Sequence, residues 1–148
     1  MSGWHAVKLV GNLLNLSTLA GIVVGLVGRA GFSRGPHGLI FATGYKLRFP
    51  MAGAFTVGNV VVSKYDRLYL DERPVLVKHE ERHSWQYFCL IGLPLLPLYL
   101  LAAAWSWLRT GCPASRNPFE RLAGLVDGNY EEKPVRSLGD SLASFRRR

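Results

Sequence analysis

The chain has 148 residues, which suits one domain of ordinary size, and it carries a net charge of +8. Its Lys and Arg residues are scattered and flank two long uncharged segments, which favours anionic lipid head groups over nucleic acid as a partner. The two cysteines, Cys89 and Cys112, provide neither a disulfide framework nor a Cys-x-x-Cys zinc pattern, so any metal ion must be bound by His and carboxylate side chains.

The first uncharged segment covers residues 9–28. Twenty such residues can just cross a hydrocarbon core of about 30 Å, although polar residues such as Asn12 dilute the first half. A cleaved signal peptide is the rival interpretation, but Arg29 follows at once and no convincing cleavage site is present. We therefore predict an N-terminal membrane anchor helix within residues 1–30.

The charges that follow this segment predict its orientation. Several basic residues lie within about twenty residues of its C-terminal end, whereas Lys8 alone precedes it. The positive-inside rule then places residues 29–148 on the cytoplasmic side of a cell membrane, with a short N-terminus outside.

Residues 31–130 form the predicted central domain. The stretch GFSRGPHG is typical of a loop, and the runs LIFATGYKLRF and AFTVGNVVVSKY indicate two antiparallel strands. From Val75 to Leu90 the apolar pattern becomes helical, and Pro74 is well placed before the first turn.

The motif His79-Glu80-Glu81-Arg82-His83 lies on this predicted helix. Residues i and i+4 share one helical face, so His79 and His83 can offer two imidazoles to one metal ion. Glu80 would lie beside the metal, where a carboxylate can take a proton from a bound water. The other interpretation is a solvated, charged helix start before an apolar segment.

The second uncharged segment, residues 88–108, is interrupted by Gly92, Pro94 and Pro97. It could cross the membrane as a kinked helix, or it could fold into an apolar helical hairpin. The hairpin would return the chain to the level of the histidines, where Glu120 follows a helix start at Asn117 or Pro118. No histidine follows His83, which makes Glu120 the best candidate for a third ligand among the downstream acids.

The stretches HEERHSWQY and NPFERLA resemble the gluzincin-type metallopeptidases, and more narrowly a group of small bacterial membrane-associated zincin-like proteins with the pattern H-E-x-x-H-x-x-Q and N-P-x-E-x-x-A. The resemblance covers about residues 55–125. It implies that His79, His83 and Glu120 bind zinc and that Glu80 is the general base.

The resemblance also implies structural roles for Gln86 and Asn117, as a helix-face hydrogen bond and a helix cap. Many such proteins carry an aspartate soon after the glutamate, to orient a histidine ligand. Here the first acid in that region is Asp127, which leaves the partner carboxylate open.

The expected fold is an α+β membrane protein with an N-terminal anchor helix, a short antiparallel sheet, and a zincin-like H-E-x-x-H helix leading into an apolar hairpin. Residues 131–148 form a charged C-terminal tail, in which Leu138, Leu142 and Phe145 have helical spacing. A disordered basic tail is the favoured interpretation, and a weak membrane-surface helix is the alternative.

The expected function is that of a membrane-associated zinc-dependent metallohydrolase, of the peptidase class, with a polypeptide substrate. The alternative is a non-catalytic subunit of a membrane protein complex that keeps a metal-stabilised zincin-like fold, since the same ligands can hold a structural ion. A lipid-binding protein with an accidental motif is a third possibility. The lipid bilayer and membrane-complex proteins are the expected partners, and nucleic acid is not.

Overall fold

The structure is a computed structural model that describes residues 2–137 and 139–140. The chain divides into two compact units, the first ending at Leu95 and the second beginning at Leu96. The helix considered above for Leu138, Leu142 and Phe145 lies outside the described residues.

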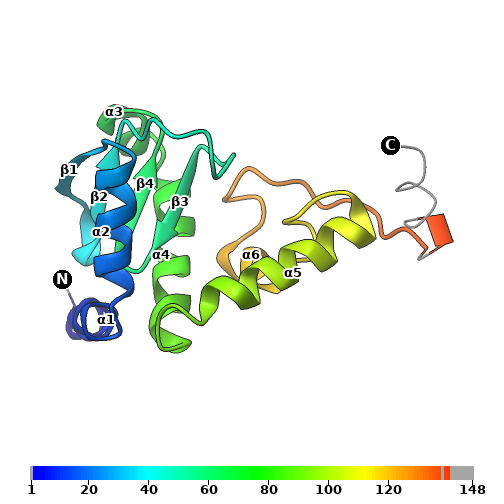
Figure 1. Cartoon of the computed structure of the whole chain (residues 1–148), viewed down its shortest axis with the longest axis horizontal. Helices are drawn as coiled ribbons and strands as arrows, with labels where there is room; N and C mark the ends of the chain where they lie inside the picture. Colours follow the sequence, from blue (N-terminus) through cyan, green and yellow to red (C-terminus); the bar gives the residue numbers. More distant parts are fainter. Residues whose placement is uncertain (1, 138, 141–148) are drawn as a thin grey trace. The chain divides into compact units, whose positions relative to one another are not determined.

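The first unit begins with two helices, continues with short strands and a 3-10 turn, and ends with two further helices (Figure 1). Its elements are α1 (Gly3–Leu14), α2 (Ser17–Val27), β1 (Gly31–Arg34), the 3-10 turn η1 (Pro36–Gly38), β2 (Ile40–Thr43), β3 (Ala54–Val57), β4 (Val60–Ser63), α3 (Arg67–Asp71) and α4 (Pro74–Cys89). The second unit contains α5 (Leu95–Thr110), which begins at the boundary, and α6 (Pro118–Ala123).

The sheet has four strands in the described residues, in the order β1-β2-β4-β3. The outer pairs are antiparallel, but β2 pairs with β4 in parallel, with Ile40 opposite Val60. The predicted two-stranded antiparallel sheet is therefore wrong in three respects. The GFSR segment is a strand rather than a loop, the AFTVGNVVVSKY run is a hairpin rather than one strand, and the sheet is mixed.

The hairpin has a local cause in the dipeptide Gly58-Asn59, which separates β3 from β4. Gly58 has a φ of 62°, in the left-handed region that two-residue hairpin turns require and that glycine adopts without strain. The turn places β4 in the middle of the sheet, where all its residues are buried.

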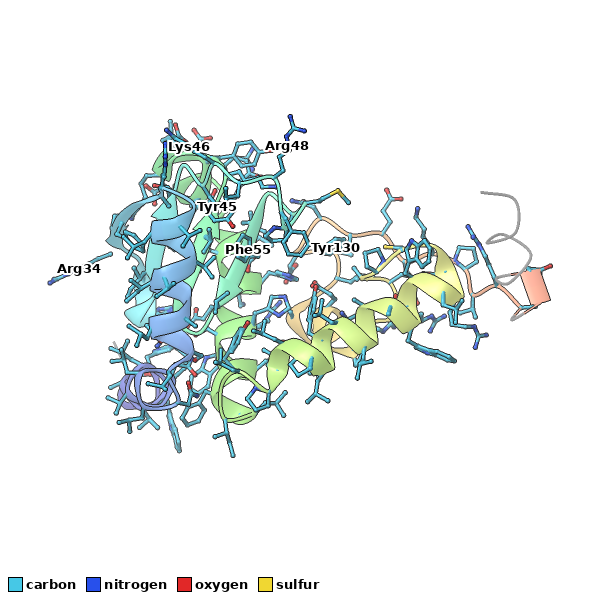
Figure 2. The ribbon with its side chains drawn as sticks, viewed as in Figure 1. Arg34, Tyr45, Lys46, Arg48, Phe55 and Tyr130 are labelled. Carbon is cyan, nitrogen blue, oxygen red and sulfur yellow. The ribbon has the colours of Figure 1, made fainter. Side chains whose placement is uncertain are left out.

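Helices cover both faces of the sheet in the first unit (Figure 1). On the α2 face the core contains Ala42, Tyr45, Val60 and Val62, with Ile22 and Val24 of α2 packed against it. Figure 2 labels Tyr45 and Phe55 on this face, and their rings meet edge to face with centroids 5.5 Å apart. On the opposite face, the side chains from α3, α4 and the sheet form a second core of Leu39, Phe41, Val61, Leu70 and Val77.

The predicted N-terminal anchor helix is wrong, because residues 9–28 belong to two helices bent by 72°. Leu16 lies between the two helices and has a φ of 66°. At the start of α2, Asn15 Oδ1 accepts from Ser17 N–H at 3.1 Å and from the Ser17 hydroxyl at 2.6 Å. In the part of the chain that the structure describes, no single helix is both long and apolar enough to cross a membrane, and α1 and α2 meet that criterion only as a bent pair.

The predicted class of α+β membrane protein with an anchor helix is accordingly corrected to a small α+β fold with a mixed sheet. The second uncharged run is also not one helix. Helix α4 ends at Cys89, and Ile91 and Gly92 follow with φ values of 58° and 91° before α5 begins. Gly92 N–H donates to the Tyr87 carbonyl at 2.7 Å, a hydrogen bond that satisfies the end of α4.

We predict that Gly21→Ala destabilises the first unit by about 1–3 kcal/mol. A Cβ atom at Gly21 would lie 2.4 Å from the Val57 carbonyl oxygen and 2.8 Å from Val60 Cβ, so α2 must move off the sheet. Urea unfolding measures the change. Gly3→Ala is the matched control, because a Cβ there meets nothing within 4 Å; equal stability of the two variants would contradict this account of the packing.

Candidate metal centre

The H-E-x-x-H motif lies on α4, which begins with Pro74 at its first turn and contains no helix breaker. One face of this helix is buried, and it includes the motif residues His79, Glu80 and His83. Charged and imidazole side chains are seldom fully buried without partners, so the contacts of these three decide what the site can do.

The two motif histidines converge. His79 Nε2 and His83 Nε2 lie 3.1 Å apart, and the two rings are nearly perpendicular with an interplanar angle of 82°. A tetrahedral ion at 2.0–2.1 Å from two nitrogens would hold them roughly 3.3 Å apart. The pair therefore fits two ligands of one small metal ion.

Gln86 orients the second histidine. Its Oε1 lies 2.9 Å from His83 Nδ1, and because an amide oxygen can only accept, this contact favours the tautomer with the proton on Nδ1 and the lone pair on Nε2. Metal-ligating histidines are usually fixed in this way through the other ring nitrogen. The role of Gln86 is thus more specific than the helix-face hydrogen bond predicted for it.

Glu80 is buried, and Thr56 of β3 holds its carboxylate. Thr56 Oγ1 lies 2.7 Å from Glu80 Oε2 and 3.2 Å from the Glu80 carbonyl oxygen, so the threonine hydroxyl contacts both side chain and backbone of this residue. Strand β3 thereby fixes the carboxylate of the residue that follows His79 on α4.

Glu120 lies in the second unit, in the first turn of α6, and is buried. Tyr99 of α5 donates a hydrogen bond from its hydroxyl to Glu120 Oε1. After α5 ends at Thr110 the chain therefore turns back along this helix, and Glu120 returns to its N-terminal half. Within this unit Tyr99 therefore fixes the position of the Glu120 carboxylate.

The start of α6 agrees with the predicted cap. Asn117 precedes the helix, Pro118 occupies its first position, and Asn117 Oδ1 accepts from Phe119 N–H at 3.0 Å. The open candidate Asp127 follows α6 in the second unit, and Tyr130, which Figure 2 labels, lies in the same segment.

No family model matches the chain, and searches of curated proteins and of solved structures find no significant match. The resemblance to zincin-like proteins, the zinc, the lipid bilayer as partner and the cell-membrane location therefore stay predictions.

Sequence reasoning did not find the hydrogen-bond partners of Glu80 and Glu120. Thr56, which bonds to Glu80, belongs to a strand that is distant in sequence, and Tyr99, which bonds to Glu120, lies in the second uncharged segment. Neither has a local motif. A polar side chain at a buried strand position beside the Gly-Asn turn was the one available signal for Thr56.

Proposed function

We propose that this protein is a zinc-dependent metallohydrolase of the peptidase class, with His79, His83 and Glu120 as zinc ligands and Glu80 as the general base. One observation carries the proposal: the two motif Nε2 atoms lie 3.1 Å apart, on the same buried helical face as a carboxylate that Thr56 holds.

Zinc is the metal that this donor set suits best. Imidazole nitrogen with a carboxylate oxygen is the usual ligand combination of catalytic zinc, with a fourth position open. Magnesium and calcium prefer sites made of oxygen ligands alone. The hydrogen bond from His83 Nδ1 to Gln86 supports a metal role, because it leaves Nε2 unprotonated.

Glu120 is proposed as the third ligand on three grounds. Its carboxylate is buried, Tyr99 fixes one of its oxygens, and α6 returns it toward the N-terminal half of α5, the helix that follows α4 in the chain. Because the tyrosine already holds the buried carboxylate in one position, less ordering is needed when the carboxylate binds a metal ion.

The chemistry follows from these roles. Zinc, when bound there, supplies a Lewis acid that polarises the scissile carbonyl. Glu80 takes the proton of the attacking water and passes it to the leaving amine. Thr56 keeps the Glu80 carboxylate in one orientation while it does so.

An extended peptide is the substrate that the neighbouring strand favours. In the described residues β3 pairs only with β4, so it forms one edge of the sheet, and its Thr56 contacts Glu80 directly. Main-chain pairing along an exposed strand edge is a common way of binding extended peptides.

A non-catalytic protein with a structural metal is the second candidate. It is favoured by the same contact of Glu80 with Thr56, since a buried, hydrogen-bonded carboxylate can also serve folding alone.

The zinc content of the purified protein tests the ligand set. We expect His79→Ala/His83→Ala and Glu120→Ala each to contain one zinc fewer per chain than the wild type, measured by elemental analysis after equilibration with Zn²⁺. Lys78→Ala, on the exposed face of the same helix, is the control and should contain as much zinc as the wild type. Unchanged zinc content in the histidine double variant would refute the site.

We predict that Gln86→Ala weakens zinc binding by about 10–100-fold, the usual cost of losing the partner of a histidine ligand. The dissociation constant can be measured by competition with a chromophoric chelator. A site that does not use His83 as a ligand would show the same dissociation constant in Gln86→Ala and in the Lys78→Ala control.

A further inference from the structure

A second cluster of potential metal ligands lies within the first unit, where three elements meet. It consists of His5 from α1, His37 from η1 and Glu81 from α4, each of which offers a ligand atom within 4.8 Å of the other two. His5 Nε2 lies 3.2 Å from Glu81 Oε1, and His37 Nδ1 lies 2.9 Å from Glu81 Oε2.

The two imidazoles are arranged together. Their rings stack with centroids 4.3 Å apart and an interplanar angle of 7°, and His37 Nδ1 is hydrogen-bonded to Glu81 Oε2. The His37 side chain is half exposed, so its ring can turn out of the stack to share one ion with His5. Ser2 Oγ lies 2.8 Å from His5 Nδ1, so the hydroxyl can fix that nitrogen while Nε2 faces Glu81. A hydrogen bond of this kind is what orients histidine ligands in metal sites.

Lys8 adds an unusual feature to the cluster. Its side chain is fully buried, and Nζ lies 3.6 Å from Glu81 Oε1, yet neither atom completes a hydrogen bond among the described residues. The Lys8 ammonium group therefore lies beside the Glu81 carboxylate and over the Trp85 ring, 5.6 Å from the ring centroid.

We propose that His5, His37 and Glu81 form a second binding site for a zinc-class transition-metal ion, at which Lys8 is the competing cation. Two imidazoles and one carboxylate select such an ion over magnesium or calcium. One ligand atom of each of the three side chains lies within 4.8 Å of the others, so small side-chain rotations bring them to the roughly 3.3 Å that separates two ligands of one tetrahedral ion.

The cluster is also accessible to an ion. The His37 side chain is 50% exposed, whereas that of Glu81 is 12% exposed, so one ligand faces solvent and the carboxylate lies inside. Because the site joins α1, η1 and α4, a bound ion would connect the N-terminal helix to the motif helix. The proposal does not depend on the function proposed above, since it uses none of its residues.

Zn²⁺ alone is the probe, titrated into the full-length protein and followed by calorimetry and elemental analysis. We expect two zinc ions per wild-type chain. His37→Asn should lose one of them, with its affinity reduced at least about tenfold. His37 has a φ of 51°, a backbone conformation that asparagine tolerates. The substitution should therefore keep the turn intact.

Two further variants separate this site from the motif site. His79→Ala/His83→Ala should keep the zinc that His37→Asn loses, so the loss of zinc from each site can be measured separately. Lys8→Met should tighten binding at the second site by about tenfold, because the competing charge is removed and the apolar side chain suits a buried position. Unchanged zinc binding in His37→Asn, or weaker binding at this site in Lys8→Met, would overturn the proposal.

Discussion

Replacement of Glu80 by glutamine is expected to lower peptide hydrolysis by about 10²–10⁴-fold while the protein keeps its zinc. Glutamine has nearly the same shape, and its side-chain oxygen can still accept from Thr56 Oγ1, so the fold should be unaffected. It cannot, however, take a proton from the attacking water. Hydrolysis can be followed by mass spectrometry on a mixed pool of unstructured peptides.

An exposed glutamate shortly before α4 provides the control for this variant. Glu72→Gln changes the same functional group, but the Glu72 side chain is 61% exposed and belongs to neither proposed zinc site. It should keep wild-type hydrolysis. If Glu80→Gln keeps both zinc and activity, the peptidase proposal is lost, and the structural-metal alternative gains support.

Replacement of Asn59 by leucine is expected to destabilise the first unit by about 3–5 kcal/mol, the largest effect on stability that we predict. Asn59 is fully buried, and its Nδ2 donates to the Leu9 carbonyl at 3.1 Å and to Thr18 Oγ1 at 2.8 Å. Its Oδ1 accepts from Ser84 Oγ at 2.9 Å and from Asn12 Nδ2 at 3.1 Å. Leucine would leave several buried polar groups without partners.

Urea unfolding of a double-mutant cycle tests this network directly. Asn12→Leu alone should also destabilise, but the double variant Asn12→Leu/Asn59→Leu should cost less than the sum of the two, because it removes two bonded partners together. Strict additivity would show that the two amides are not coupled. Thr43→Ala serves as a control, since its hydroxyl makes only an exposed hydrogen bond at 3.4 Å.

This network explains why the first uncharged segment was misinterpreted. Hydropathy alone treats Asn12 and Thr18 as polar dilution of a membrane helix. In the structure both are buried and bond to the turn between β3 and β4, which lies next to the α1–α2 bend. Their partners are more than forty residues away in sequence, so no local pattern could indicate this arrangement.

The pairing of the strands in the sheet could not be predicted from the local sequence either. The parallel pairing of β2 with β4 depends on a hairpin that inserts β4 between β2 and β3, and pairing of this kind is not encoded in any window of the sequence. The hairpin itself was accessible, because Gly58-Asn59 between two β-branched runs is a recognised turn signal. The tertiary order of the strands was not.

Local sequence signals predicted the bounds of the motif helix and the shared face of its histidines more accurately than they predicted the sheet. Helix α4 runs from Pro74 to Cys89, against a prediction of Val75 to Leu90, because proline at the first turn and the glycine after the last turn mark its ends. The spacing of His79 and His83 predicted a shared face, and their Nε2 atoms lie 3.1 Å apart. The residue that holds the neighbouring Glu80 carboxylate could not be predicted from the local sequence, because Thr56 comes from a strand.

A crystal structure of the zinc-loaded protein, with the metal located by its anomalous scattering, tests the central claim most directly. The account predicts an ion about 2.0–2.2 Å from His79 Nε2, His83 Nε2 and a carboxylate oxygen of Glu120. An ion bound by the two histidines without Glu120, or no ion at the histidines at all, would contradict it.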